Sequence, residues 1–316
     1  MPILMRLQKL QNSQAVSWKT FALCVIAFLF LGSNGLAWSS ARHMVIAAEA
    51  WRDLSPALKI KATELLKSHP DYITWVKSFS AGPGALDLPA FIFMRASTWP
   101  DEIRRHSKSY DHPHWHYIDY PLRGPSFAME PEPAPKDDIL FGIDQCEKFL
   151  GDANASPEER AVYLSWLIHL IGDLHQPLHC ASLFNDAYPN GDKGGNAFYV
   201  KPASRGIRLH SFWDGLLGTS TKVNPQLNYA IEIQRQFPRK SFKELQMARK
   251  PSDWSLEGRK LAIEKVYQRG HLKGSIDEET APALPPDYAK AAKAVAERQA
   301  ALAGYRLADE VARISK

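Results

Sequence analysis

The stretch that organises this chain is apolar, long enough for a helix, and interrupted by polar groups: Trp166-Leu-Ile-His169-Leu-Ile-Gly172-Asp173-Leu-His175-Gln-Pro177-Leu-His179. His169 and Asp173 are four residues apart, so they share one face of a helix. Pro177 ends that helix and leaves His179 free to point elsewhere. A carboxylate buried in an apolar helix is costly unless it is paired or bound to a metal ion. The pattern therefore indicates the middle of a multi-metal hydrolytic site.

A second pair with the same spacing lies about forty residues further on, in His210-Ser-Phe-Trp-Asp214. One histidine on an apolar helix is usually a satisfied core residue, but two separate His-x-x-x-Asp pairs favour metal binding. Imidazole and carboxylate ligands without thiolates suit zinc, although spacing alone does not count the ions. Single candidate ligands surround the two pairs: His43, Asp101, His112, His114, His116, His175 and His179.

Length and charge set broad limits on the class of protein. The chain has 316 residues, enough for one large domain or two small ones. Its net charge is +5, but three positive charges precede residue 38 and no acidic residue does, which leaves +2 for the remainder. Such a weak balance does not argue for nucleic-acid binding by electrostatics alone. Any affinity for a polyanion must come from local groups.

The N-terminal segment is typical of a signal peptide. The apolar run from Thr20 to Gly32 follows basic residues and is short for a membrane span. Small residues at Gly35 and Ala37 predict cleavage after Ala37, so that Trp38 becomes the first residue. We therefore expect a signal peptide over residues 1–37, a mature domain over residues 38–316, and a periplasmic or secreted protein. The alternative is an uncleaved anchor.

Two cysteines remain after such cleavage, Cys146 and Cys180. In an oxidising compartment they could form one disulfide, which their separation permits but does not establish. The alternative role for Cys180, which follows His179, is that of a zinc ligand.

Helical periodicity and capping signals run through almost the whole mature chain. We predict one all-α domain of many helices around the metal site, with a short β element in the loops. Expected helices begin at the cap Ser40, at Ser55-Pro56, at the cap Asp87 and at the capping box Ser156-Pro-Glu-Glu159. Others are expected over residues 72–79, 136–150, 210–214, 224–237, 241–249, 253–269 and 286–315. Extended pieces are expected near residues 116–120 and 196–201, within loops.

Several motifs together carry a resemblance to a known family. They are Trp38-Ser-Ser-Ala-Arg-His43, Trp99-Pro-Asp101-Glu-Ile-Arg104, His116-Tyr117-Ile-Asp119, the complete run from His169 to His179, Gly194-Gly195-Asn196, and His210 to Asp214. Weaker matches are Trp254-Ser-Leu-Glu257 and Gly304-Tyr-Arg-Leu-Ala308. In these residues the chain resembles the zinc-dependent, single-strand-specific class I nucleases of fungi and plants and their bacterial relatives. The match spans essentially all of the mature chain.

The resemblance implies three Zn²⁺ ions. The first would be held by Asp101, His116, His169 and Asp173. Asp173 would bridge to a second ion, held also by His43 and by the amine and carbonyl oxygen of Trp38. A third, more exposed ion would be held by His179, His210 and Asp214, while His175 and Gln176 would orient ligands. A free amine on Trp38 exists only after the signal peptide is removed, so export would complete the site.

The resemblance also implies an activity: a zinc-activated hydroxide cleaves phosphodiester bonds of single-stranded DNA and RNA and leaves 5′-phosphates. A 3′-nucleotidase activity is a further expectation, with nucleotides as ligands, a monomeric state and no stable protein partner. Asp101 would orient the attacking water and Arg104 would neutralise phosphoryl charge, unless Arg104 is an ordinary surface ion pair. Asn196 would bind phosphate, unless it is a plain turn residue.

Base recognition would fall to Tyr117 and Asp119. Tyr117 would stack on an unstacked base and Asp119 would accept a hydrogen bond from the base edge, which favours single strands. The alternative role for Tyr117 is packing in the hydrophobic core.

Two other functions compete with this interpretation. A zinc-dependent phospholipase C shares the expected fold and ions, but the spacing from Trp38 to His43 is short and Asp214 stands where those enzymes have glutamate. A non-catalytic zinc-binding protein would saturate its metal ions with protein ligands. His179, His210 and Asp214 supply only three ligands, which leaves a position for water or substrate.

Overall fold

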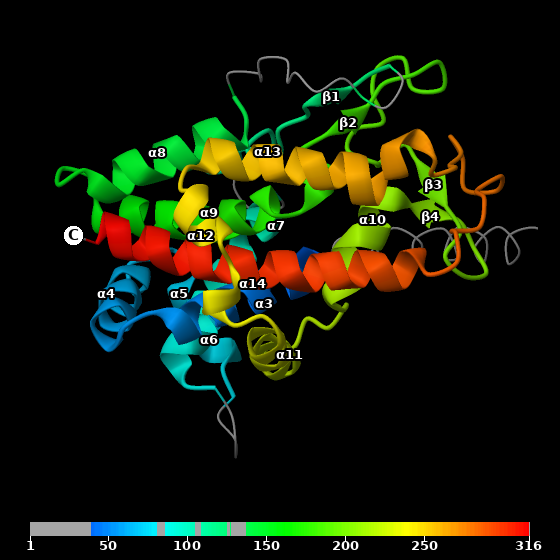
Figure 1. The fold of residues 1–316 in the computed structure, drawn as a ribbon. Coiled ribbons are helices and arrows are strands. Elements are labelled where there is room, and N and C mark those ends of the chain that lie inside the picture. Colours follow the sequence, from blue (N-terminus) through cyan, green and yellow to red (C-terminus); the bar gives the residue numbers. More distant parts are fainter. Residues whose placement is uncertain (1–38, 81–85, 105–108, 125–126, 128–136, 316) are drawn as a thin grey trace, which may run out of the picture. The chain divides into compact units, whose positions relative to one another are not determined.

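The residues that the structure describes all lie within the unit Trp38–Lys316. The structure is a computed structural model, and it describes residues 39–80, 86–104, 109–124, 127 and 137–315. Helices dominate these residues, and each of the short strands among them is two residues long (Figure 1). The expectation of an all-α fold with a short β element is therefore confirmed. The predicted signal peptide and Trp38 lie outside the described residues.

The helices, labelled as in Figure 1, alternate with short connections. They are α3 (Ser39–Asp53), α4 (Pro56–Leu66), α5 (Tyr72–Ser78), α6 (Leu88–Ala96), α7 (Trp99–Ile103), α8 (Ile139–Gly151), α9 (Pro157–Leu174), α10 (Leu209–Asp214), α11 (Val223–Gln236), α12 (Glu244–Met247), α13 (Pro251–Leu261) and α14 (Tyr288–Ile314). Between them lie the 3₁₀ turns η1 (Pro177–His179), η2 (Gly215–Leu217), η3 (Arg239–Ser241) and η5 (Gln268–Gly270), and the π turn η4 (Ala262–Val266).

The central helix is α9, and its start is the capping box that the sequence predicts. Ser156 Oγ accepts a hydrogen bond from Glu159 N at 3.1 Å, and Glu159 Oε2 accepts one from Ser156 N at 2.9 Å. From Leu164 onward every residue of the helix is buried. A helix that is apolar on all sides belongs in an interior, and α9 packs against α8, α3, α14, α4 and α7. The polar residues His169 and Asp173 are thereby placed in the core.

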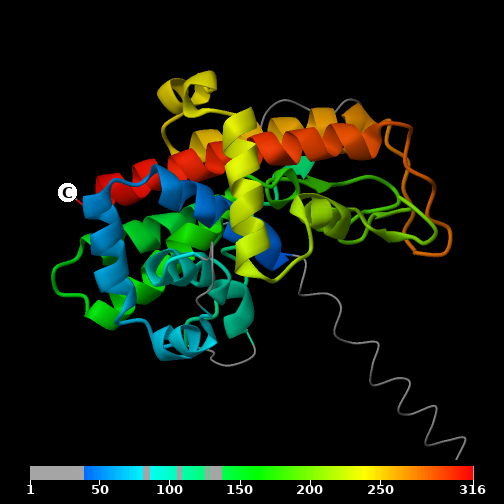
Figure 2. The same ribbon diagram turned by 90° about the horizontal axis from the view of Figure 1, so that it is seen from below.

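The helix α14 packs along α3 and α9, and α11 crosses it, as Figure 2 shows. Gly304 permits the close approach to α3, because a Cβ there would lie 2.5 Å from Glu49 Cβ. Two residues further on, Arg306 donates to Glu257 Oε2 at 2.7 Å and lies 2.9 Å from His175 Nε2. Its guanidinium also covers the Trp254 ring at 4.9 Å. The two weaker motifs at the C-terminal end therefore meet each other beside α9.

The strands lie in the loops that flank η1 and α10. β1 (Pro121–Leu122) pairs in parallel with β2 (Ser182–Leu183), and β3 (Tyr199–Val200) pairs antiparallel with β4 (Ile207–Arg208). A second apolar cluster lies under these loops and is separate from the main helical core. In the chain, β1 precedes and β2 follows His179, and β4 lies just ahead of His210. The two strand pairs therefore fix the segments that carry these histidines.

Several boundaries differ from the predictions. Ser40 is not a cap, because α3 already begins at Ser39. The helix expected over residues 253–269 is α13 followed by a π turn, and the chain then turns at Gln268, Arg269 and Gly270, all with positive φ. The helix expected over residues 241–249 shortens to α12. Tertiary packing outweighs local propensity at these surface segments.

Cys146 and Cys180 are both buried and free, so the disulfide considered above is not present. Cys180 Sγ instead donates a hydrogen bond to Leu174 O at 3.4 Å, and it is not among the grouped potential metal ligands of the described residues. No described helix combines the length and the apolar character needed to cross a membrane.

Candidate metal centre

Six separate segments bring the predicted ligands together. His43 comes from α3, Asp101 from α7 and His116 from the loop before β1. His169 and Asp173 come from α9, His179 from η1, and His210 and Asp214 from α10. Among the described residues these side chains form three groups of potential metal ligands: His43, Asp101 and His169; His116, His169 and Asp173; and His179, His210 and Asp214.

Asp173 lies at the centre of the cluster. Its Oδ2 is 3.0 Å from both His169 Nε2 and His116 Nδ1. Its Oδ1 is 3.2 Å from His43 Nε2 and 3.5 Å from His179 Nδ1. Asp101 Oδ1 lies slightly further away, 3.8 Å from His169 Nε2 and 3.9 Å from His116 Nδ1. One carboxylate, 1% exposed, thus faces four imidazoles.

Backbone carbonyls fix the orientation of three of the imidazole rings. The Nδ1 of His169 bonds Ser97 O at 2.8 Å, that of His179 bonds His116 O at 2.6 Å, and that of His210 bonds Gly194 O at 2.7 Å. A ring that donates through Nδ1–H leaves Nε2 with a lone pair, which is the usual arrangement of metal-binding histidines. The three rings are therefore held in a form that can bind a metal ion.

The electrostatics of the cluster also fit a metal ion. Burial, with the nearby His169, lowers the pKa of His43 to about 4, and burial lowers the pKa of His179 to about 3. Both rings are therefore neutral near pH 7, as ligands must be. Against burial, the surrounding histidines hold the pKa of Asp173 and that of Asp101 well below the usual range.

Two buried ring nitrogens, each on the opposite side of its ring from the nitrogen that faces Asp173, lack a hydrogen-bond partner within the described part of the chain. His43 Nδ1 and His116 Nε2 are buried without a hydrogen-bond partner among the described residues. Such groups are rare in folded proteins and call for an explanation such as an ion or water. The donor set of imidazoles and carboxylates, without thiolate, matches zinc. The residues present therefore fit the metal ions that the resemblance implies.

The third group lies nearer the surface and is supported by its own contacts. Gln176 Nε2 donates to Asp214 Oδ1 at 3.2 Å, and its Oε1 accepts from Leu178 N at 2.6 Å. The Gly194-Gly195 pair has positive φ at both residues, and a Cβ on Gly194 would overlap the carbonyl oxygen of Leu178. Glycine is needed at position 194 because the backbone has positive φ there and lies directly against the backbone of η1. The carbonyl oxygen of Gly194 also accepts the hydrogen bond from His210 Nδ1.

The predicted substrate-binding residues, Tyr117 and Asp119, follow the candidate ligand His116 in the chain. Tyr117 is 38% exposed, and burial together with Asp119 raises its pKa while the charge of Arg104 opposes this rise. Burial and Asp192 raise the pKa of Asp119 to about 6, against the charge of His210. The charges of Arg104 and Asp119 therefore both act on Tyr117, and the charge of His210 acts on Asp119.

Arg104 and Asn196, which are predicted to act on the substrate, each contact another residue of the protein. Arg104 Nε lies 4.0 Å from Asp111 Oδ1, and its side chain is 41% exposed. Asn196 Nδ2 donates to Lys193 O at 3.0 Å, so Asn196 also serves as a turn residue. Its neighbour Gly195 accepts a hydrogen bond from His210 N, which keeps Asn196 next to the third group.

The remaining histidine candidates are not ligands in this arrangement. His112 stacks on Trp115 with ring centroids 3.8 Å apart, and His114 is an exposed partner of Asp137. His175 Nδ1 bonds Ile171 O at 2.7 Å while its Nε2 faces Arg306. His175 therefore connects α9 to α14 and does not contact a ligand, whereas Gln176 does orient Asp214.

Sequence reasoning missed two residues of this centre. Arg42 Nη2 donates to Asp173 Oδ1 at 2.7 Å, although only its place beside His43 could have drawn attention to it. Gly172 lies against His43, where a Cβ would be 2.8 Å from Nδ1. His43 stacks on His169 at 3.8 Å, so the glycine gives space to that pair of rings. A glycine inside an apolar helix was the available signal for this close approach.

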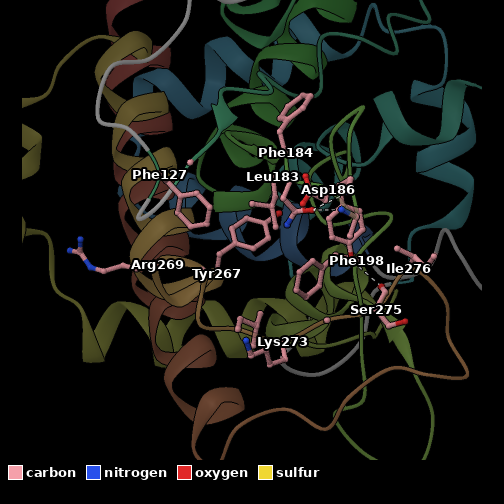
Figure 3. Close-up of a pocket in the computed structure, with 17 residues that line it drawn as sticks. Phe127, Leu183, Phe184, Asp186, Phe198, Tyr267, Arg269, Lys273, Ser275 and Ile276 are labelled. Carbon is pink, nitrogen blue, oxygen red and sulfur yellow. Dashed lines mark hydrogen bonds between the residues drawn. The ribbon is translucent and has the colours of Figure 1, made fainter.

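A cavity of about 650 Å³ lies beyond β2, bordered by aromatic side chains and by Arg269 and Lys273 (Figure 3). No predicted metal ligand is among its described lining residues. Tyr267 forms part of its wall, and its hydroxyl donates to Asp192 Oδ2 at 2.5 Å. The cavity is therefore a neighbour of the loop that carries Gly194 and Gly195, and does not contain the metal centre.

The fold and the site together define an all-α protein with a buried centre of imidazole and carboxylate ligands, of the kind that binds divalent metal ions for hydrolysis. The chain belongs to the S1/P1 nuclease family, whose model matches residues 38–316. It is similar to Endonuclease 4 of Arabidopsis thaliana, with 27% identity over 239 residues that cover 69% of this chain and 75% of that protein. It is also similar to Endonuclease 1 of the same plant, with 28% identity over 143 residues, 41% of this chain and 44% of that protein. The chain is accordingly a nuclease, a hydrolase of phosphodiester bonds.

Proposed function

We propose that the protein is a zinc-dependent endonuclease that prefers single-stranded DNA and RNA and leaves 5′-phosphate ends. The observation that carries the proposal is the position of Asp173, whose two oxygens lie 3.0–3.2 Å from nitrogens of His169, His116 and His43. A separate, more open group at His179, His210 and Asp214 supports a further ion. Cleavage of 3′-mononucleotides is part of the same proposal.

Three zinc ions are proposed, with the ligands that the resemblance implies. Asp101, His116, His169 and Asp173 would hold one, and Asp173, His43 and the N-terminal Trp38 would hold a second. His179, His210 and Asp214 would hold the third. Zinc in such groups supplies Lewis acidity, which lowers the pKa of water to about 7 and stabilises negative charge on phosphate oxygens.

The protein groups position the reactants. The pKa of Asp101 is held low by His169 and His116 despite burial, so its carboxylate is ionised and able to accept a hydrogen bond from an attacking water. Arg104 is exposed and permanently charged, which suits it to offset charge on the phosphoryl group. Asn196, at the edge of the third group, would donate a hydrogen bond to a phosphate oxygen.

Single-strand preference is proposed to come from Tyr117 and Asp119. The exposed ring of Tyr117 can stack on a base, a contact worth roughly 1–3 kcal/mol that every base can make. Asp119 lies two residues further on, close to His210, and could accept from the base edge. A base in a duplex is stacked on its neighbours, so it cannot reach this pair.

Parallel assays would test the activity. Purified protein is incubated with single-stranded DNA, duplex DNA, RNA and phosphatidylcholine, each with and without chelator. We expect rapid cleavage of the single strands, slower cleavage of duplex, no release of lipid headgroup, and loss of all activity in chelator with recovery on adding zinc. Lipid hydrolysis would make the phospholipase alternative correct, and zinc binding without any hydrolysis would favour the non-catalytic one.

Asp173→Asn tests the central position of this carboxylate. The amide keeps the shape but loses the charge that faces four imidazoles, so we expect the variant to lose two zinc ions and at least 100-fold in activity. Zinc content after dialysis is measured, with Asp137→Asn at an exposed carboxylate as control. Loss of a single ion would contradict the proposed bridge.

A further inference from the structure

Arg42 is a buried arginine in the middle of the candidate metal centre, and no motif assigned it a role. Its Nη2 donates to Asp173 Oδ1 at 2.7 Å and its Nη1 to Asp214 Oδ1 at 3.3 Å. The side chain is 6% exposed. One guanidinium therefore joins two carboxylates that are proposed to hold different metal ions.

The two carboxylates need a cation whenever metal ions are absent. Asp173 is 1% exposed and the side chain of Asp214 is 13% exposed, and a buried carboxylate without a partner is strongly unfavourable. Arginine stays protonated under all physiological conditions, so its charge is permanent. Arg42 is placed where it can compensate both groups at once.

The contacts of Arg42 differ from those of a typical arginine–carboxylate ion pair. A strong arginine–carboxylate pair is bidentate, with two parallel hydrogen bonds to one carboxylate. Arg42 instead divides its contacts between two carboxylates, and one of these contacts is longer than a normal N–H···O bond. Its Nε is buried without a hydrogen-bond partner among the described residues.

Arg42 also contacts both side-chain atoms that are proposed to bind the second ion. Nη2 lies 3.3 Å from His43 Nε2 in addition to 2.7 Å from Asp173 Oδ1. Those two ligand atoms are themselves only 3.2 Å apart. A divalent ion bound to both would lie against a guanidinium of the same sign, and like charges at such a distance repel strongly where water is excluded.

We propose that Arg42 is an exchangeable placeholder cation: it holds Asp173 and Asp214 in the metal-free protein and competes with the zinc ion that His43 and Asp173 bind. This inference rests on the proposed function, because it requires that zinc binds here. When zinc binds, the guanidinium of Arg42 moves away from Asp173. Removing the charge of Arg42 has two opposite effects: the metal-free protein becomes less stable and zinc binds more tightly.

The experiment compares the wild-type protein with Arg42→Met, which keeps the length of the side chain, and Arg42→Lys, which keeps its charge. Arg239→Met, which removes an arginine that pairs with Asp53 and Asp309, is the control for loss of an ion-paired arginine that contacts none of the candidate ligands. Each protein is stripped with chelator and its thermal unfolding is recorded. Each is then titrated with Zn²⁺ alone against a chromophoric chelator, which reports affinity without any measurement of activity.

For Arg42→Met we expect the stripped protein to unfold at least about 4 °C lower than wild type and at least one of the zinc ions to bind at least about tenfold more tightly. Arg42→Lys should remain within about threefold of wild type in zinc affinity, because it keeps the competing charge. Arg239→Met should change stability by a similar small amount with and without zinc and leave zinc affinity unchanged.

Unchanged zinc affinity in Arg42→Met overturns the exchange, whatever happens to stability, because lower stability alone would make Arg42 an ordinary structural counterion. In that case the metal centre itself still stands, since zinc binds to both proteins. If zinc binds to neither protein, the proposed function and this inference are both wrong. The two failures are therefore distinguishable.

Discussion

The candidate centre depends on individual atoms that have little freedom to move. The rings of His43 and His169 are stacked 3.8 Å apart in the core, and Gly172 lies against the first of them. His169 is further fixed by its bond to Ser97 O. A small change at any of these positions is transmitted to Asp173, because these side chains are buried against one another.

Gly172→Ala is a direct test of this tight packing. The added Cβ would lie 2.8 Å from His43 Nδ1, so the ring must shift away from His169. We expect a loss of about 1–3 kcal/mol in unfolding free energy and weaker zinc binding, measured by urea unfolding and by zinc titration. Gly151→Ala, whose Cβ would meet nothing within 4 Å, is the control and should be neutral or slightly stabilising. Equal behaviour of the two variants would contradict the prediction.

Glu49 on α3 is a second residue with an unusual environment. It is fully buried, both carboxylate oxygens are without a hydrogen-bond partner among the described residues, and burial raises its pKa, opposed only weakly by Arg52. In the unfolded chain the carboxyl loses its proton near pH 4.5, while the folded protein keeps it. The folded state is therefore penalised progressively as pH rises above about 4.5, up to the raised pKa.

Glu49→Gln removes this penalty. We expect the variant to be more stable than wild type, with a difference that grows by about 1.4 kcal/mol per pH unit between the two pKa values. Unfolding at pH 5, 6, 7 and 8 measures it, with the exposed Glu64→Gln as control. A difference that does not change with pH would show that Glu49 is ionised in the folded protein.

At the scale of elements, the metal centre is held by contacts between helices that are distant in sequence. Arg306 on α14 pairs with Glu257 on α13 and faces His175 at the end of α9. His175, which Arg306 faces, follows Asp173 by two residues, so this contact fixes the last turn of the helix that carries Asp173. His175 therefore connects α9 to α14 and, through Arg306, to α13. The resemblance had implied that His175 orients a ligand.

Arg306→Gln should lower the unfolding free energy by roughly 3 kcal/mol, because it leaves Glu257 and His175 without their buried partner. Denaturant unfolding measures the loss. Arg239→Gln, which removes an exposed pair with Asp309, is expected to cost at most about 1 kcal/mol. If both changes cost the same, the buried pair does not hold the helices together.

At the scale of the whole molecule, the proposal connects activity with export. We expect cleavage after Ala37 to release the Trp38 amine, a ligand with a reference pKa of roughly 8. Protein that begins at Trp38 should be fully active, while protein with one additional residue ahead of it should lose most activity and one zinc ion. Mass spectrometry of the purified N-terminus, zinc analysis and the nuclease assay give the answer. Equal activity of both forms would exclude the amine as a ligand.

Local patterns were sufficient for the helical fold class and the capping box of α9. Helix spacing places His169 beside Asp173, and His210 beside Asp214, without any knowledge of the rest of the fold. Element ends at the surface were less well predicted, as at α12 and after α13, because weak propensities there are decided by packing. The Cys146–Cys180 bridge could not be judged from separation alone, and the structure leaves both thiols free.

The amino-acid sequence by itself determined that this is a helical protein with two His-x-x-x-Asp pairs, each on one face of a helix, because those patterns depend on neighbours within one or two turns. Only the tertiary structure decided that the Nδ1 atoms of His169, His179 and His210 bond backbone carbonyls, where His175 points, and that Arg42 reaches both Asp173 and Asp214. Each of these depends on atoms contributed by segments far apart along the chain, such as Ser97 O, Gly194 O and Arg306. The physical reason is that hydrogen bonds and ion pairs in a core are set by three-dimensional packing, for which spacing in sequence carries no information.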